Sequence, residues 1–412
     1  MPHSQAPPLL VTFASQHDPR DVREWSGSIY HVMRALRRQN VHLDMLGNLE
    51  RHRVLLHAVL NRMLGAAQGG HNPLTDASRS PAMARRFARR IEGHLERIRP
   101  DVLFSPSSIP IALVRTEVPK VFYTDATFAG LIDTYSDGRR FPAGYLEAGH
   151  ALEAEAIRSC DLVIYASEWA ARSAIEDYGA DPAKVKVVPF GANLDIEPDL
   201  AMVEDDIARR PQHRLELLFL GVAWERKGGP KALEVARLLH ARGIDVRLRI
   251  VGCDPGVKEP PSFVEVIPFI AKTTNAGQQA LYEIIRTSHF LVLPTIAECF
   301  GIVFAEASAF GVPSITHSVG GVPTAVQEGR NGHLFDRHAP AEELAARIAA
   351  LFADRKAYEA LARSSFHAYR ERLNWNVNGA LLSTHLRSLK RGSLVPLHGA
   401  MHVEAMSVPR TA

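Results

Sequence analysis

Residues 290–317, FLVLPTIAECFGIVFAEASAFGVPSITH, decide the fold class of this chain. They consist of a short apolar run at 290–294, a helical segment at 301–310 and a second apolar run at 313–317. Two β-rich runs joined by a helix are typical of a unit whose strands lie parallel in one sheet. The stretch therefore predicts an α/β domain built on a parallel sheet.

The same alternation of β-rich runs and helical segments fills most of the chain. Before residue 100, for example, Met83, Phe87, Ile91, Leu95 and Ile98 recur every three or four positions and so share one helix face. The alternation predicts two doubly wound, Rossmann-like domains. The other expected strands are 9–14, 41–46, 102–105, 120–123, 162–166 and 185–189 in the first domain, and 215–220, 245–251 and 264–267 in the second.

A polar, acidic and proline-punctuated stretch divides the two series of strands. We expect an N-terminal domain at 1–191, a linker at 192–212 and a C-terminal domain at 213–374. A helix at 375–391 can cross back to the N-terminal domain, and the Gly/Pro-interrupted tail at 392–412 is expected to be mobile.

Composition narrows the class of protein. The 412 residues are 46% hydrophobic and 23% charged, which excludes collagen-like and mainly disordered chains. No apolar run approaches the ~20 residues of a membrane-spanning helix, and the N-terminus lacks the pattern of a secretory signal. Cys160, Cys253 and Cys299 lie far apart and form neither a disulfide framework nor a metal cluster, so we expect a cytoplasmic protein.

Charge is unevenly distributed. The net charge of +3 argues against a dedicated nucleic-acid binder, yet residues 31–100 hold thirteen arginines, from Arg34 to Arg99, against five acidic residues. These arginines could rest on anionic lipid, or they could form a solvated face whose aliphatic stems cover apolar surface. The sequence leaves both interpretations open.

Two glutamates follow the strand at 290–294. Glu298 lies in the loop after the strand, and Glu306 lies in the helix that Gly301 opens. Ligands of open parallel sheets bind beyond the carboxyl ends of the strands, and a helix N-terminus favours phosphate. Glu306 could accept paired hydrogen bonds from a ribose diol, while Glu298 could reach another part of the same ligand. The alternative is a solvated loop acid and an acid stabilised by the helix dipole.

Two further turns could bind anions. The strand at 215–220 leads into Arg226 and Lys227, followed by two glycines, which would place positive charge and open backbone near a pyrophosphate. After the first strand, Gly27 lies in a Ser-Gly-Ser turn that opens a helix. The alternatives are a basic surface turn and an ordinary glycine-containing βα turn.

Together these motifs resemble those of the retaining family 4 glycosyltransferases of the GT-B fold. The resemblance rests on the E-x7-E pair at 298 and 306, the GVP strand, the GG-V-P turn, the Asn331-Gly332 pair and the upstream K-G turn. It is densest over 215–335 and extends more thinly to the Ser-Gly-Ser turn and to 185–193. It implies two domains facing across a cleft, the N-terminal one binding the acceptor and the C-terminal one the nucleotide sugar.

The resemblance also implies roles for individual residues. Lys227 and Arg226 would bind the donor diphosphate, Glu298 the donor-sugar hydroxyls near the reacting carbon, and Glu306 the ribose. Gly27 would allow close approach of the N-terminal domain to the diphosphate. Backbone N–H groups of Gly301, Ile302 and Val303 would meet the phosphates or the sugar, and Ile270, in the segment 268–271, would lie near the base.

Three positions depart from the family pattern. Val222 stands where the family often has arginine, so Arg226 could substitute for it. The usual His-Asp pair appears as Thr124-Asp125. Asp125 is therefore the candidate catalytic residue of the N-terminal domain, and the alternative is a structural acid at a strand end. Thr324 follows the GG-V-P turn in place of glutamate.

The expected activity is that of a retaining hexosyltransferase. It would move a sugar from a nucleotide-diphosphate donor to a hydroxyl of a sugar, a lipid-linked molecule or a small molecule, in carbohydrate or cell-envelope biosynthesis. Because the chain contains no Asp-x-Asp motif and no zinc-binding spacing of histidines, we expect neither a metal site nor a cofactor. Acceptor contacts are expected in loops such as 128–140, and location in the cytoplasm includes peripheral contact with the inner membrane face.

Two other functions remain alternatives. One is a nucleotide-sugar-binding protein of the same fold that lacks turnover. The other is a nucleotide-sugar epimerase, which would need no acceptor. The presence of Glu298, Glu306 and Lys227 favours the transferase over both.

Overall fold

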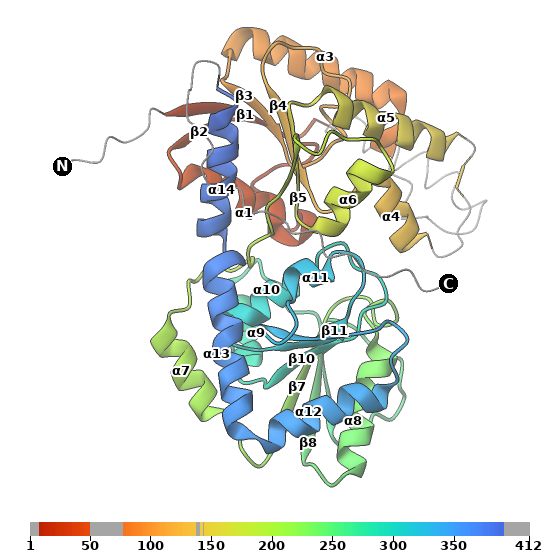
Figure 1. Cartoon of the computed structure of the whole chain (residues 1–412), viewed down its shortest axis with the longest axis vertical. Coiled ribbons are helices and arrows are strands. Elements are labelled where there is room, and N and C mark those ends of the chain that lie inside the picture. The colour runs from red at the N-terminus through yellow and green to blue at the C-terminus, as the bar shows by residue number, and fades with distance from the viewer. Residues whose placement is uncertain (1–7, 50–76, 137–140, 143, 391–412) are drawn as a thin grey trace, which may run out of the picture.

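The chain forms two α/β lobes, one above the other (Figure 1). The computed structural model describes residues 8–49, 77–136, 141–142 and 144–390. Each lobe has a six-stranded parallel sheet, in the order β2-β1-β3-β4-β5-β6 in the N-terminal lobe and β12-β11-β10-β7-β8-β9 in the C-terminal lobe. Helices flank both sheets, so the predicted pair of doubly wound, Rossmann-like domains is confirmed.

The N-terminal lobe has its strands buried on both faces. Along β3 (Val102–Ser105), β4 (Lys120–Thr124) and β5 (Leu162–Tyr165), alternate residues belong to two separate apolar clusters. Successive side chains of a strand point to opposite faces of the sheet, and both sets are buried because helices cover both faces of this parallel sheet. The other elements are β1 (Leu9–Ala14), β2 (Val41–Leu46), β6 (Val185–Val187), the 3-10 turns η1 (Glu24–Gly27) and η2 (Ala77–Arg79), and helices α1 (Ser28–Arg37), α3 (Pro81–Ile98), α4 (Phe128–Tyr135), α5 (Tyr145–Ser159) and α6 (Glu168–Glu176).

The C-terminal lobe repeats this arrangement. Its central strands β7 (Leu215–Leu220), β8 (Val246–Val251) and β10 (Phe290–Leu293) are mostly buried, and their charged residues are Glu216, Arg247 and Arg249. The other elements are β9 (Val264–Ile267), β11 (Ser314–His317), β12 (Gly332–Phe335), and helices α8 (Gly229–Ala241), α9 (Asn275–Arg286), α10 (Ile302–Ala309), α11 (Val322–Ala325), α12 (Ala341–Ala353) and α13 (Arg355–Arg372).

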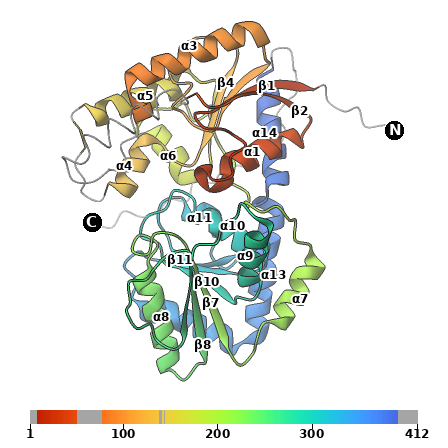
Figure 2. The same cartoon turned by 180° about the vertical axis from the view of Figure 1, so that it is seen from behind.

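The chain crosses between the lobes twice at one edge. The last helix, α14 (Trp375–Ser388), leaves the C-terminal lobe and packs against α1 of the N-terminal lobe (Figure 2). The two crossings are bonded to each other, because Ala192 N donates to Leu373 O at 2.9 Å. At Gly191 the two segments lie so close that a Cβ atom would be 2.5 Å from Trp375 N, and only glycine fits.

Two segments are more ordered than the sequence indicated. The stretch 192–212 is not a plain linker, because it contains α7 (Leu200–Arg209), whose Val203 and Ile207 are fully buried. Arg355 Nη2 donates to Ile207 O at 2.7 Å and ties α7 to α13. Residues expected in an acceptor loop at 128–140 form α4 instead, with its N-terminus capped by Thr127. Residues 137–140 and the tail at 392–412 lie outside the described part of the chain.

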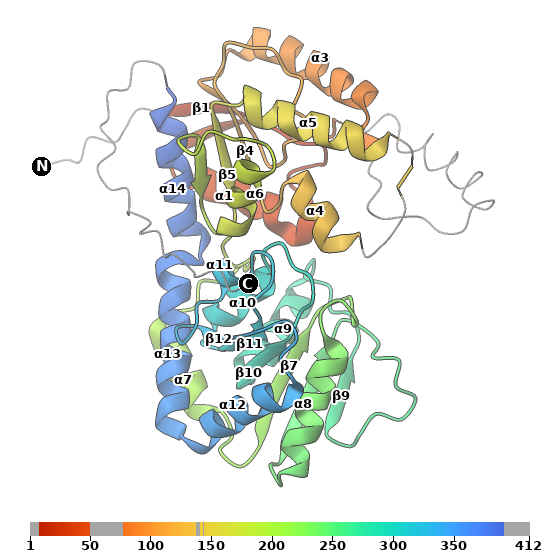
Figure 3. The same ribbon diagram turned by 45° about the vertical axis from the view of Figure 1, so that its right-hand side comes forward.

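The lobes face each other through the helices beside their sheets. α4 and α6 of the N-terminal lobe lie opposite α10 and α11 of the C-terminal lobe (Figure 3). None of the helices in the described ranges is long and apolar enough to cross a membrane.

Candidate active site between the lobes

An interlobe cavity of about 870 Å³ lies between the two sheets. Loops that follow β4, β7, β8, β9 and β10 line it. The cavity therefore lies at the carboxyl ends of the parallel strands, where ligands of such folds bind. Nine of the ten residues singled out from the sequence line this one cavity: Asp125, Arg226, Lys227, Ile270, Glu298, Gly301, Ile302, Val303 and Glu306. Gly27, the tenth, lies between Ser26 and Ser28, which both line it.

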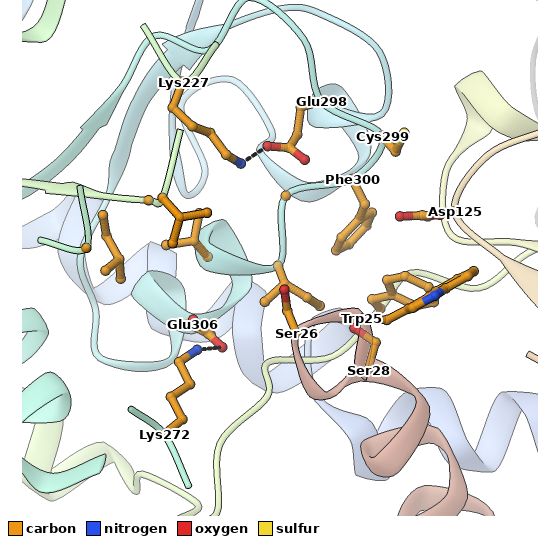
Figure 4. Close-up of a pocket in the computed structure, with 18 of the residues that line it drawn as sticks. Trp25, Ser26, Ser28, Asp125, Lys227, Lys272, Glu298, Cys299, Phe300 and Glu306 are labelled. Atoms are coloured by element: carbon orange, nitrogen blue, oxygen red, sulfur yellow. Dashed lines mark hydrogen bonds and ion pairs between the residues drawn. The ribbon is translucent and has the colours of Figure 1, made fainter. Parts of the chain in front are cut away.

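The basic turn after β7 meets the glutamate loop after β10. The ammonium group of Lys227 contacts the Glu298 carboxylate (Figure 4). The Arg226 guanidinium lies 3.8 Å from the same carboxylate. Arg226 Nη1 also donates to Ala297 O at 2.9 Å. A Cβ atom at Gly228, whose φ is +76°, would lie 1.9 Å from Pro294 O. The glycine after Lys227 therefore lets the cationic turn lie against the acidic loop.

A pair of glycines supports the backbone of Glu298 from the other side. Gly321 N donates to Glu298 O at 3.2 Å, and a Cβ atom at Gly320 would lie 2.1 Å from that oxygen. The GG-V-P turn, a family motif in the sequence, thus has a structural reason for its glycines. It fixes the loop from which Glu298 extends into the cavity.

Glu306 forms an ion pair that the sequence did not indicate. Lys272 Nζ lies 2.6 Å from Glu306 Oε1, and Glu306 is 1% exposed. Burying an isolated carboxylate costs desolvation free energy, and the ion pair with Lys272 offsets part of that cost. Lys272 directly follows the segment 268–271, and that proximity was the signal that could have identified it.

The N-terminal lobe brings an irregular turn to the opposite wall. Trp25, Ser26 and Gly27 have φ values of 49°, 54° and 88°, so three successive residues are left-handed. Such conformations cost about 1–3 kcal/mol for a non-glycine residue and cluster at functional sites. Asn193 Nδ2 holds the turn by donating to Ser26 O at 2.9 Å. The turn directs the N-terminus of α1 and the Trp25 ring toward the cavity (Figure 4).

Asp125 follows β4 and faces the C-terminal lobe near Phe300 (Figure 4). Burial, with a smaller contribution from the Glu298 carboxylate, raises the pKa of Asp125 to about 6. Burial also raises the pKa of the Cys299 thiol, which is therefore unsuited to act as a thiolate nucleophile.

Cations outnumber acids on the cavity wall. The lining includes five cationic residues, namely Arg23, Arg79, Arg226, Lys227 and Lys272, against Asp125, Glu298 and Glu306. Such an excess favours a ligand that carries negative charge. Within the described ranges, no group of three or more His, Cys, Asp or Glu side chains could hold a metal ion.

Two of the departures from the family pattern have clear positions. Val222 lines the cavity with 68% of its surface exposed, whereas Arg226 supplies a guanidinium to the same wall. Thr324 lies at the boundary of the lobes, where its hydroxyl donates to the Glu168 carboxylate and accepts a bond from Glu168 N at 3.2 Å. Thr324 therefore joins α11 to α6.

Two family models match successive parts of the chain. The model "Glycosyltransferase Family 4" matches residues 27–196, and the model "Glycosyl transferases group 1" matches residues 204–367. The two matches correspond to the N-terminal and C-terminal lobes. They leave outside residues 1–26, which include β1 and most of η1, residues 197–203, which include the start of α7, and residues 368–412, which include the end of α13 and α14.

Curated relatives carry the name D-inositol 3-phosphate glycosyltransferase. The protein from Streptomyces scabiei is 30% identical over 245 residues, which are 55% of this chain and 54% of that one. The protein from Corynebacterium glutamicum is 26% identical over 234 residues, 53% of this chain and 55% of that one. The chain thus spans about half the length of the curated relatives it matches.

Solved structures share the fold over nearly the whole chain. Sucrose-phosphate synthase from Thermosynechococcus elongatus has a TM-score of 0.66 at 16% identity, covering 94% of this chain and 100% of that one. HepE from Anabaena, solved in complex with UDP, has a TM-score of 0.61 at 16% identity, covering 92% and 100%. With both lobes matched by family models and the two-lobed fold in common, this chain belongs to the family 4 glycosyltransferases of the GT-B fold.

Proposed function

We propose that this protein is a retaining, metal-independent hexosyltransferase that uses a nucleotide-diphosphate sugar. The observation that carries the proposal is the interlobe cavity, where the Lys227–Glu298 and Lys272–Glu306 pairs face the N-terminus of α1. The HepE structures with UDP and with UDP-glucose support a nucleotide-sugar donor for this fold. The acceptor is a hydroxyl-bearing sugar, lipid-linked molecule or small molecule.

Residues of the C-terminal lobe that line the cavity bind different parts of the donor in this proposal. Lys227, Arg226 and the backbone N–H groups at the start of α10 bind the diphosphate, as cations and helix N-termini bind phosphates elsewhere. Glu306, buried in α10, accepts hydrogen bonds from the ribose diol. Glu298 contacts hydroxyls of the donor sugar, because it lies beside Lys227 and so beside the diphosphate.

The reaction breaks the bond between the anomeric carbon and the β-phosphate oxygen. The acceptor oxygen bonds to the same carbon on the face from which the phosphate departs, and the hydroxyl proton passes to the departing phosphate oxygen. Negative charge grows on the nucleotide diphosphate during this step. Fixed cations that meet this charge lower the barrier more than they stabilise the bound donor. Closure of the lobes over a bound donor would exclude water from the cavity.

The variant Asp125→Asn tests whether Asp125 affects the transfer rate, the free energy of unfolding, or both. Because burial raises the pKa of Asp125 above its unfolded value of 3.8, its stability contribution is complete below pH 4 and is lost as the pH rises through about 6. Asp125→Asn should therefore be more stable than the wild type at pH 7.5, by about 1–3 kcal/mol, with no such gain at pH 3.5. Its transfer rate should fall about tenfold or more if Asp125 contacts the sugar.

Denaturation curves at the two pH values and initial rates at pH 7.5 check both parts. Glu96→Gln, an exposed acid on α3, is the matched control and should change neither quantity. A variant as active as the wild type would restrict Asp125 to a structural role.

A donor screen distinguishes the transferase from its alternatives. Released nucleotide diphosphate is measured with a panel of nucleotide sugars, and donor binding is measured by calorimetry. The transferase should release nucleotide diphosphate slowly by hydrolysis and faster when an acceptor is added. Binding without release would support a nucleotide-sugar-binding protein, and epimerised sugar without an acceptor would support an epimerase.

The exposed arginines of α3 support peripheral contact with an anionic membrane. The basic segment is not one patch, because Arg34 and Arg38 pair with Asp195 and Glu197 near the lobe crossing, and Arg51, Arg53 and Arg62 lie outside the described residues. Arg85, Arg89 and Arg97 are exposed on α3. Sedimentation with acidic vesicles should occur at low salt and decline at high salt. Replacing these three arginines with glutamine should abolish sedimentation with the vesicles. No sedimentation, or sedimentation that does not change with salt, would refute the membrane contact.

A further inference from the structure

A second cavity adjoins the interlobe cavity. This side cavity has a volume of about 680 Å³ and lies between helices α4 and α6 and the C-terminal-lobe loops that follow β7, β10, β11 and β12. Tyr135, Arg226 and Glu298 line both cavities. Its volume falls within the range of ~300–1,000 Å³ that small-molecule sites usually have. Both cavities therefore meet at the carboxylate that the proposed function places beside the donor sugar.

An aromatic–cation pair forms the partition between the cavities. The Arg226 guanidinium lies 5.2 Å from the centroid of the Tyr135 ring. Arg226 is also fixed by its bond to Ala297 O, so the partition has a defined shape. A group that passes beside it from the side cavity arrives at Glu298.

The charge balance reverses between the two cavities. The side cavity is lined by three arginines and five carboxylates, whereas cations are in excess in the interlobe cavity. An excess of carboxylates repels phosphate but provides acceptors for the hydroxyl groups of a neutral ligand. The side cavity therefore suits a polyhydroxylated molecule without a phosphate group.

One face of α6 supplies the polar and aromatic groups. Trp169, Arg172, Ser173 and Glu176 follow the spacing i, i+3, i+4 and i+7, which places them on one side of the helix, and all four line the side cavity. A Cβ atom at Gly130 would lie 2.8 Å from the Trp169 ring, so the ring is packed directly against α4. Arg172 is exposed and makes no hydrogen bond or ion pair to any described residue.

We propose that the side cavity binds a neutral saccharide portion of the acceptor. The acceptor is then a glycan of at least two sugar rings, with one ring against the Trp169 platform and the reacting ring beside Glu298. An aromatic platform flanked by guanidinium and carboxylate groups offers an apolar face and fixed hydrogen bonds, which a sugar ring requires. The inference rests on the proposed function, and the transfer step is the one already described, with the hydroxyl of the reacting ring as the attacking group.

Acceptors of graded length test the proposal. The probes are p-nitrophenyl glycosides of one, two and three hexose rings, together with inositol 3-phosphate as a phosphorylated acceptor, each used with the donor that releases most nucleotide diphosphate in the screen. The wild type should prefer two rings over one by about tenfold in kcat/KM. Inositol 3-phosphate should be the poorer acceptor.

Variants of α6 localise that preference. Trp169→Ala and Arg172→Ala should each remove most of the preference for the second ring, mainly by raising KM. Neither should change the calorimetric affinity for the donor or its hydrolysis without acceptor, because neither residue lines the interlobe cavity. If Trp169→Ala fails to fold, Arg172→Ala provides the test, since the Arg172 side chain is exposed and forms no ion pair with a residue that the structure describes. Lys356→Ala, an exposed change on α13, is the control.

The outcomes distinguish this inference from the proposed function. Equal use of one-ring and two-ring probes, no transfer to any saccharide, preference for inositol 3-phosphate, or unchanged kinetics of Arg172→Ala would each overturn the inference while donor hydrolysis persists. A wild-type protein that neither binds nor hydrolyses any donor would overturn the proposed function and the inference with it.

Discussion

Replacing Lys227 with alanine should slow sugar transfer about a hundredfold, with a smaller effect on donor affinity. The Lys227 ammonium group contacts Glu298 inside the interlobe cavity, so a donor diphosphate placed there would have this cation beside its departing oxygen. The charge on that oxygen increases as the glycosidic bond breaks, and the missing cation would therefore raise the barrier by about 3 kcal/mol. Initial rates of nucleotide diphosphate release at saturating donor measure the change.

Two further variants make this result specific. Lys227→Arg keeps the positive charge and should retain more activity than Lys227→Ala. Lys258→Ala removes an exposed lysine elsewhere on the C-terminal lobe and should behave as the wild type. If Lys227→Ala keeps the full turnover rate, the diphosphate does not lie beside this residue.

Glu306→Ala and Glu298→Ala should have opposite kinetic signatures. Glu306→Ala should weaken donor binding about ten- to hundredfold, because hydrogen bonds from a ribose diol to a buried carboxylate would be lost. Glu298→Ala should mainly lower kcat, since its carboxylate lies near the proposed site of bond cleavage. Calorimetry with the donor and steady-state rates separate the two effects.

Conservative variants control for the ion pairs that each change disrupts. Glu306→Ala leaves Lys272 without its partner, and Glu298→Ala does the same for Lys227. Glu306→Gln and Glu298→Gln preserve the side-chain size and part of the hydrogen bonding, so they should show milder forms of the same signatures. Small and equal effects from both alanine variants would contradict the assigned roles.

The sequence predicted most of the strands because they are short runs rich in Val, Leu, Ile and Phe between polar or turn-forming segments. Those at 9–14, 41–46, 102–105, 215–220 and 264–267 have the expected limits. It did not predict α7, whose acidic surface resembles a linker while its buried face is small. It also did not predict α4, which begins with a cap at Thr127 but is only eight residues long.

The sequence identified the site residues that belong to recognisable motifs, but it did not show which of them contact one another. Lys227 and Glu298 were identified separately, yet their contact joins residues 71 positions apart and depends on close approach at Gly228. Lys272 was missed although it directly follows the segment 268–271, because its pairing with Glu306 joins residues 34 positions apart. Trp25 and Tyr135 were not assigned to the site because no motif includes them. Each reaches the cavity through the packing of whole elements, which single-sequence patterns do not contain.

The paired crossings near Gly191 and Trp375 restrict how the lobes can move. Two adjacent covalent connections, bonded to each other through Ala192 and Leu373, leave rotation about a line through them as the easiest relative motion and oppose sliding. Groups near this axis keep their spacing during such a swing, whereas those far from it separate most. Under the proposed function, substrates would enter and products would leave through one hinge-like rotation that preserves the alignment of the two lobes.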